Sequence, residues 1–157
     1  MPVRVQTEDF DAGAEISHLR QSRRDVGAIV SFIGQVRDIN GGDDIAALTL
    51  EHYPGMTEKA LENIVSQAKQ RWDIFEALVI HRVGTLQPTE QIVLVVVSGA
   101  HRSEAFAASE FIMDYLKTEA PFWKKEKTQA GERWVDAKSS DDAARNRWNQ
   151  ISNKGNR

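Results

Sequence analysis

Residues 91–99, QIVLVVVSG, are apolar on both alternating faces. A strand of this kind has to be covered on both sides, so it belongs in the centre of a sheet rather than at an edge. Directly after it, residues 103–118 repeat apolar side chains at helical spacing, and Ser103 is placed to cap the helix start. A buried strand that leads into an amphipathic helix predicts a sheet with helices packed on its faces.

The rest of the chain also alternates between helical and strand-like patterns. We expect helices at residues 12–23, 57–72 and 139–150, and further strands at residues 26–38, 45–53, 77–84 and 131–137. Thr57 is the expected cap of the second helix, and the turn signal at residues 40–43 predicts that the strands on either side of it pair. Residues 1–150 therefore predict a single α+β domain, followed by a disordered tail at residues 151–157.

The composition limits the classes of function. The 157 residues are 41% hydrophobic and 27% charged, as is typical of one globular domain. The formal charge of -3 gives no global reason to expect binding to nucleic acid or an anionic membrane. No apolar run is long enough to span a bilayer, so a cytoplasmic location is the default expectation. The chain has no cysteine, which excludes disulfides, thiolate metal sites and a protein-borne persulfide.

Several familiar catalytic patterns are missing from the sequence. The histidines lack the spacing of metal ligands, so we expect no metal; they are His18, His52, His81 and His101. No GxxxxGK loop occurs, so ATP is not expected as a ligand. Ser98, Ser103 and His101 lie close together in the chain, but no GxSxG elbow supports a serine hydrolase.

The segment KTEAPFWKKE, residues 117–126, places lysines around large apolar side chains. Pro121 should end the preceding helix, because the residue before a proline is biased away from helical dihedrals. Lys117 and Lys124 are either solvated surface charges or a tuned pair, since a desolvated amine near other cations loses its proton more readily and becomes a base or nucleophile. Stacking of nucleic-acid bases on Phe122 and Trp123 is a third interpretation, which the acidic composition disfavours.

Two further positions are candidates for binding an anion. His101 and Arg102 follow the central strand and precede a helix N-terminus, where backbone N–H groups and the helix dipole favour phosphate. The alternative is an ordinary helix cap with Arg102 in a surface ion pair. Arg37 in GQVRD comes at the end of a strand beside a turn, and is either a second clamp or an ordinary surface arginine.

The sequence resembles the MoaE family, the large catalytic subunits of molybdopterin synthase. The segments that carry the resemblance cover most of the chain and are GAIVSFIGQVRD, LTLEHYPGMTEKAL, IVLVVVSGAHRSEAF, MDYLKTEAPFWKKE and GERWVDA. The resemblance implies an α/β-hammerhead-like mixed sheet with flanking helices and a small β-rich subdomain. It also implies a sulfurtransferase that converts cyclic pyranopterin monophosphate to molybdopterin, with no cofactor in this subunit. The sulfur would come from the C-terminal Gly-Gly thiocarboxylate of a small ubiquitin-like partner, in a heterotetramer built on a homodimer of the large subunit.

The resemblance also assigns roles to residues. It implies that Lys117 and Lys124 are catalytic and also contact substrate. The other substrate-contacting positions that it implies are Gln35, Val36, Arg37, His101, Arg102, Lys125 and Glu126, and the pocket would be lined by Phe32, Met113 and Pro121. Which lysine is the acid or base and which stabilises charge stays open, as does a contact of Lys138 across the dimer. The rival interpretation is a non-catalytic module that binds a ubiquitin-like tail or single-stranded nucleic acid.

Overall fold

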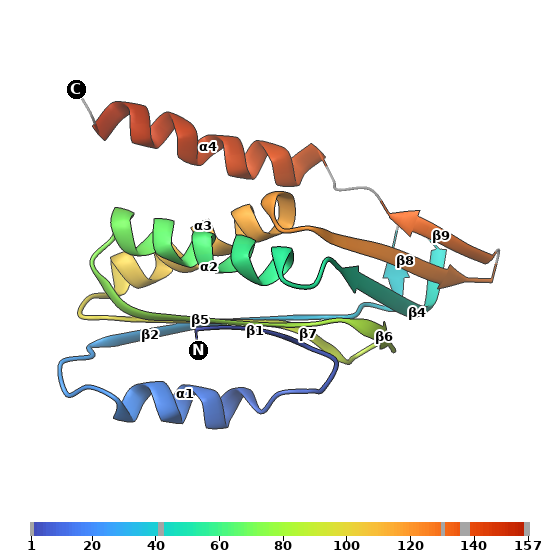
Figure 1. Cartoon of the computed structure of the whole chain (residues 1–157), viewed down its shortest axis with the longest axis horizontal. Coiled ribbons are helices and arrows are strands. Elements are labelled where there is room, and N and C mark those ends of the chain that lie inside the picture. Colours follow the sequence, from blue (N-terminus) through green and yellow to red (C-terminus); the bar gives the residue numbers. More distant parts are fainter. Residues whose placement is uncertain (1, 41–42, 130, 136–138, 156–157) are drawn as a thin grey trace.

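The computed structural model describes residues 2–40, 43–129, 131–135 and 139–155 of the chain (Figure 1). In chain order the elements are β1 (Val3–Gln6), α1 (Ala12–Gln21), β2 (Ala28–Gln35), β3 (Ile39–Asn40), β4 (Asp43–His52), α2 (Met56–Arg71), β5 (Ile74–Arg82), β6 (Gly84–Leu86), β7 (Gln91–Gly99), α3 (Arg102–Glu119), β8 (Phe122–Thr128), β9 (Gly131–Val135) and α4 (Ser139–Gly155).

The main sheet has the strand order β1-β5-β7-β2. β7 lies between β5 and β2 and pairs antiparallel with both, which confirms the central position predicted from its apolar sequence. β1, which the sequence analysis did not anticipate, adds to β5 in parallel. The predicted pairing of residues 26–38 with residues 45–53 is wrong: β2 pairs with β7, and β4 pairs with β3, β6 and β8.

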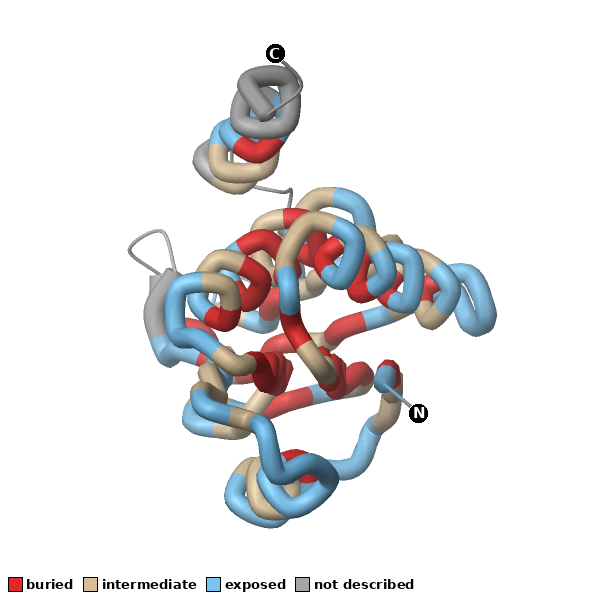
Figure 2. The backbone as a smooth tube through the Cα atoms, turned by 90° about the vertical axis from the view of Figure 1, so that its left-hand side faces the viewer, coloured by how far each residue is buried: buried red, intermediate tan, exposed pale blue. Residues whose placement is uncertain are grey.

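Alternate residues of the central strands contribute to cores on opposite faces of this sheet. Val95 and Val97 of β7 belong to the core under α2 and α3, whereas Leu94 and Val96 belong to the core over α1. Figure 1 shows the same layers, with α1 on one side of the sheet and α2 and α3 on the other. In Figure 2 the buried residues concentrate in the sheet and in the helices above it, whereas α1, below the sheet, consists mainly of exposed and intermediate residues. Both faces of β7 are thus covered, which explains its continuous apolar run.

The two helices on the upper face begin one residue earlier than the sequence patterns suggested. α2 begins at Met56 after Gly55, whose φ of 85° favours glycine, and the Gly55 N–H donates to the Glu58 carboxylate. Thr57 is therefore inside the helix and is not its N-cap. α3 begins at Arg102, so Ser103 does not cap it either.

The second sheet follows the order β3-β4-β8-β9, and β6 pairs with β4 on the edge opposite β8. It forms around a small core of Val36, Leu48, Leu50, Val83 and Leu86. The segment after Pro121 enters this sheet as β8, which pairs antiparallel with β4. The mixed main sheet with flanking helices and a β-rich subdomain confirms the predicted fold class.

α4 lies across the upper helices (Figure 1). Its Trp148 is buried against Trp72 and Phe111, with ring centroids 5.3 Å and 5.7 Å away. The predicted disordered tail at residues 151–157 overlaps α4, which runs to Gly155, and residues 156–157 lie outside the described part. Of the predicted strand at residues 131–137, β9 covers 131–135, and residues 136–137 are likewise not described. Among the described residues, no helix is long and apolar enough to cross a membrane.

Candidate active site

A cavity of about 300 Å³ lies where the two sheets meet the C-terminal half of α3. Its wall includes Arg37, Lys117 and Lys124, so cations from three distant segments of the chain surround one space. The carboxylates of Glu126 and Asp141 also line it. Glu126 is buried and accepts hydrogen bonds from Arg133 at 3.2 Å and 3.1 Å, which offsets its charge within the protein.

β8 contributes to the cavity by simple alternation of its side chains. Phe122, Lys124 and Glu126 line the cavity, because every second residue of a strand points to the same face. Trp123 and Lys125 are not among the lining residues: Trp123 is exposed, and the Lys125 amine lies 3.5 Å from Glu132 and 5.3 Å from the Trp134 ring centroid. The structure therefore separates Lys124 from Lys125, which the resemblance had grouped together.

The last turns of α3 supply the apolar side of the cavity and one of its amines. Met113, Leu116, Lys117 and Ala120 recur at helical spacing and all line the cavity. Lys117 is in the last turn of the helix, where the negative end of the helix dipole stabilises a cation. Its side chain is exposed, so solvent and ligands reach the amine.

β2 and the residues after it form the opposite side. Phe32, Gln35, Val36 and Arg37 line the cavity, and the β2–β7 register shifts between Gly34 and Gln35. Gln35 and Arg37 are exposed and Val36 is buried, so both of these polar side chains are open to a ligand.

The structure does not bring every predicted site residue to this cavity. His101 and Arg102 stand at the N-terminal end of α3, and 15 residues at about 1.5 Å rise each put Arg102 roughly 22 Å along the helix from Lys117. Pro121 is not a lining residue; its carbonyl oxygen accepts a hydrogen bond from the Thr57 hydroxyl at 3.0 Å. Lys138 lies outside the described residues.

His81 also lines the cavity, and no sequence pattern marked it as a site residue. It is 5% exposed and its ring stacks on Phe122, with centroids 3.8 Å apart. Burial, with smaller contributions from the nearby Lys117 and Lys124 charges, lowers the pKa of His81 to about 3, so the ring is neutral. The signal in the sequence was a lone histidine in the otherwise apolar strand ALVIHRVG.

The described residues were compared with the ligand sets that hold metal ions. Among the described residues, no group of histidine, aspartate and glutamate side chains is placed to hold a metal ion. The arrangement instead offers cations for an anionic ligand and an aromatic wall for a flat one.

Comparison with known proteins gives the family of the chain. Residues 5–119 match the family model described as MoaE protein. The chain belongs to the MoaE family. The molybdopterin synthase catalytic subunit of Ralstonia nicotianae is 63% identical over 150 residues, which are 96% of this chain and 85% of that protein. The molybdopterin synthase catalytic subunit of Escherichia coli is 55% identical over 144 residues, 92% of this chain and 95% of that protein.

Solved structures show the same MoaE fold. The MoaE protein from Burkholderia ambifaria superposes with a TM-score of 0.80 at 56% identity, over 94% of this chain and 97% of that one. Molybdopterin synthase from Staphylococcus aureus gives a TM-score of 0.79 at 30% identity, over 87% of this chain and 98% of that one. The family match ends before Lys124, but the alignment with the Ralstonia relative spans nearly the whole chain.

Proposed function

We propose that this chain is the catalytic subunit of a molybdopterin synthase, which transfers sulfur to cyclic pyranopterin monophosphate and produces molybdopterin. The observation that carries the proposal is the convergence of Arg37, Lys117 and Lys124 on one cavity in a chain of the MoaE family. A cyclic phosphate and a thiocarboxylate are both anions, and charge-assisted hydrogen bonds from these cations would hold them. The absence of cysteine fits a reaction whose sulfur arrives on another chain.

The sulfur donor in this proposal is a small ubiquitin-like subunit with a C-terminal Gly-Gly thiocarboxylate. In each of two transfers the sulfur forms a bond to a carbon of the pterin side chain while that carbon loses its oxygen, either to the opening cyclic phosphate or as water. Water then hydrolyses the thioester and releases the tail as a carboxylate. Lys117 moves the proton in these steps; its place in the cavity wall and its exposure support this role. Lys124 stabilises the negative charge that develops on the tail and on the opening phosphate. The buried Glu126 beside it accepts hydrogen bonds from Arg133 and helps to shape this wall of the cavity.

The distance along α3 gives a reason for the proposed homodimer. His101 and Arg102 of one chain are too far from its own Lys117 to share a substrate with it. In an assembly built on two copies, these residues can serve the cavity of the partner copy. Lys125 lies on the face of β8 that points away from this cavity, so it would contact only a substrate bound to another chain.

The reconstituted reaction tests the proposal. The chain is mixed with the thiocarboxylated small subunit and cyclic pyranopterin monophosphate, and mass spectrometry is used to detect the dithiolene product. The matched control is the small subunit with an ordinary C-terminal carboxylate, which can dock but carries no sulfur. Docking without product in the thiocarboxylate arm would contradict the enzyme and favour the non-catalytic module.

Binding of single-stranded nucleic acid receives no support from the site. Phe122 stacks on His81 inside the cavity, while the neighbouring Trp123 is exposed on the other face of β8. The two aromatic rings therefore do not form one stacking surface. The cytoplasmic location expected from the sequence stays part of the proposal, and cell fractionation would test it.

A further inference from the structure

His81 presents a polar atom to the cavity that the proposed mechanism does not use. It lies on β5 directly opposite Val93 of β7, and both residues line the cavity. Its neighbour Ile80 belongs to the core on the other face of the sheet. The alternation of β5 thus aims the imidazole at the ligand space.

The orientation of the ring determines which nitrogen carries the hydrogen. Nδ1 of His81 lies 2.8 Å from the carbonyl oxygen of Arg82. A carbonyl oxygen only accepts hydrogen bonds, so Nδ1 is the donor and carries the hydrogen. In a neutral imidazole the other nitrogen, Nε2, is then an acceptor with a free lone pair.

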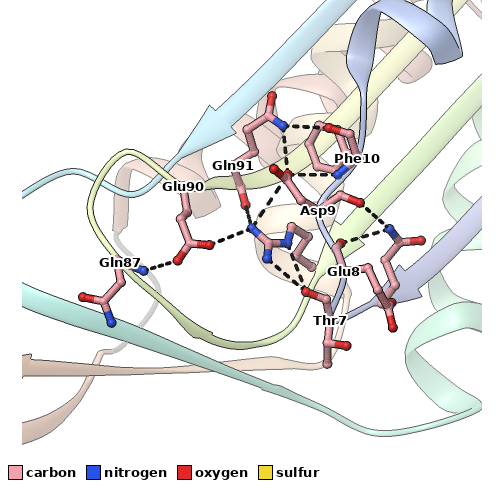
Figure 3. Close-up of polar contacts among 9 residues, drawn as sticks. Thr7, Glu8, Asp9, Phe10, Gln87, Glu90 and Gln91 are labelled. Carbon is pink, nitrogen blue, oxygen red and sulfur yellow. Dashed lines mark hydrogen bonds and ion pairs between the residues drawn. The ribbon is translucent and has the colours of Figure 1, made fainter.

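The backbone that fixes this orientation is itself held firmly. The buried Arg82 guanidinium donates to the carbonyl oxygens of Thr7, at 3.2 Å and 3.0 Å, and of Gln91, at 3.0 Å. Glu90 lies 3.5 Å from it and Asp9 lies 3.8 Å from it. Figure 3 shows these groups converging on the guanidinium from the β1–α1 connection and the start of β7. The Phe122 ring, stacked 3.8 Å away, limits the remaining freedom of the imidazole.

Nε2 is open to the cavity. Among the residues that the structure describes, it has no hydrogen-bond or ion-pair partner. In the same set of residues, no fully buried side-chain nitrogen or oxygen lacks a partner. Nε2 must therefore be reached by solvent, and the only side of this 5% exposed residue known to be open is the cavity that it lines.

We propose that His81 is a further substrate-binding residue, whose Nε2 accepts a hydrogen bond from an N–H group of the heterocyclic ring of the substrate. This inference rests on the proposed function, since it assigns an orientation to the same substrate. The lone pair of Nε2 repels an anion, so the phosphate faces Arg37, Lys117 and Lys124 and the N–H edge of the pterin faces His81.

The surroundings keep this acceptor available. Burial and the charges of Lys117 and Lys124 hold the pKa of His81 near 3, so the ring does not become a cation at the pH at which the reaction is measured. A protonated histidine would donate from both nitrogens and would select a different ligand. A neutral acceptor in a cationic cavity therefore distinguishes the two ends of a substrate that has an anionic group and an N–H donor.

Two substitutions separate the nitrogens of the ring. His81→Asn keeps a donor near the position of Nδ1 but removes the acceptor at Nε2, whereas His81→Gln places an amide oxygen near Nε2 and loses the Nδ1 contact. We expect His81→Asn to weaken binding of cyclic pyranopterin monophosphate about 10-fold, as the loss of one buried hydrogen bond predicts. His81→Gln should recover most of that loss. Calorimetry gives the dissociation constants, and docking of the small subunit serves as the internal control.

A purely structural His81 predicts the reverse order. In that case His81→Asn would bind the precursor like the wild type, and His81→Gln, which loses the donor to the Arg82 carbonyl, would bind it more weakly. A fall in kcat for His81→Asn with an unchanged dissociation constant would also overturn the inference. It would mean that Nε2 accepts a hydrogen bond from a lysine amine of the cavity and not from the substrate.

A measurement on the unmodified chain does not depend on the variants folding. In ¹⁵N-detected histidine spectra, we expect the Nδ1–H tautomer in the free protein and a change at Nε2 alone when the precursor is added. An unchanged Nε2 resonance at saturating precursor would overturn the inference while the proposed function stands. If the wild type neither binds nor converts the precursor, the proposed function fails, and the role of His81 fails with it.

Discussion

At the scale of single residues, the face of an element on which a side chain lies decides its chemistry. Lys124 and Lys125 are adjacent in the chain, yet Lys124 lines the cavity and Lys125 lies against Trp134 on the outer face of β8. Lys117 reaches the same cavity from the end of α3. The positive charge of the site thus comes from separate segments that only the folded chain brings together.

Lys117→Ala should abolish most turnover and leave the fold intact, because Lys117 is exposed at a helix end and provides the proton-transfer group. Loss of a general acid or base typically lowers the rate by about 10² to 10⁴. The measurement is dithiolene formation under single-turnover conditions, with circular dichroism to check folding. Lys69→Ala is the matched control, since Lys69 is in the last turn of the neighbouring α2 and does not line this cavity. Normal turnover of Lys117→Ala would remove Lys117 from the mechanism.

Arg37→Ala should weaken binding of the precursor more than docking of the small subunit, because its proposed partner is the phosphate. The loss of a charge-assisted hydrogen bond corresponds to about 1.5–3 kcal/mol. Calorimetric titrations with each ligand measure the two effects separately. Equal weakening of both binding events would argue against a phosphate contact. Arg20→Ala on the exposed side of α1 is a suitable control.

His81 should make stability depend on acidity below neutral pH. The pKa of the ring is lowered from 6.5 to about 3 on folding, so between these values the unfolded chain binds a proton that the folded chain does not. The free energy of unfolding should therefore fall as the pH falls from 6.5 to 3, by up to about 1.4 kcal/mol per pH unit from this group. The titratable groups around it are Lys117 on α3, Lys124 on β8 and His52 on β4.

Denaturation midpoints at several pH values measure this dependence. His81→Gln should flatten the slope in that window, whereas His18→Asn on the exposed side of α1 should leave it unchanged. If the free energy of unfolding depends on pH equally in His81→Gln and in the wild type, the His81 ring takes up its proton in the folded chain as readily as in the unfolded chain.

At the scale of elements, the site depends on the junction between the end of α3 and the start of β8. The change of direction occurs at Pro121, and the Thr57 hydroxyl of α2 holds it by donating to the Pro121 carbonyl at 3.0 Å. The same hydroxyl accepts from the Tyr53 N–H at 3.0 Å. Thr57 is fully buried, and both of these hydrogen bonds are partly buried. One side chain thus links the start of α2 to the junction between the two lysine-bearing elements.

Thr57→Val should lower the free energy of unfolding by about 1–3 kcal/mol, because it removes two hydrogen bonds, each worth about 0.5–1.5 kcal/mol, at nearly constant volume. Turnover should fall as well, since Lys117 and Lys124 flank the junction. Chemical denaturation measures the first effect. Thr57→Ser keeps the hydroxyl and is the matched control. A Thr57→Val protein with wild-type stability would show that this hydroxyl does not hold the junction.

At the scale of the whole molecule, α3 connects two charged regions that lie far apart. His101 and Arg102 are at one end of the helix and Lys117 is at the other, about 22 Å away. An isolated chain cannot place one substrate against both. The proposed homodimer resolves this separation if each copy lends its N-terminal end of α3 to the cavity of the other.

Mixed dimers test this arrangement. Lys117→Ala and Arg102→Ala homodimers should both be impaired, but a heterodimer of the two variants should contain one complete cavity. If it is assembled from chains with different affinity tags, it should recover about half of the wild-type turnover, because the effects of mutations in separate cavities are independent. A heterodimer as inactive as the two homodimers would place Arg102 in the cavity of its own chain or outside the site.

Local patterns in the sequence predict the helices and most of the longer strands, but not which strands pair. The apolar residues 91–99 predict a central strand, and the helical spacing of residues 103–118 predicts α3, because each pattern reflects the burial of one element's own faces. The pairing of β2 with β7 instead of β4 depends on contacts between distant residues, so the turn signal at residues 40–43 gave the wrong neighbour. β1 was missed because four residues are too few to show a period.

For the site, the sequence by itself determined the chemistry that was available: a cysteine-free, weakly acidic chain with a local cluster of lysines and aromatic residues. The tertiary structure decided which of those groups share a cavity. Lys124 and not Lys125 faces it because of the register of β8, and His81 presents Nε2 because the Arg82 carbonyl holds Nδ1. Composition and periodicity are properties of neighbouring residues, whereas the direction of a side chain toward a ligand is set by hydrogen bonds and packing between segments far apart in the chain.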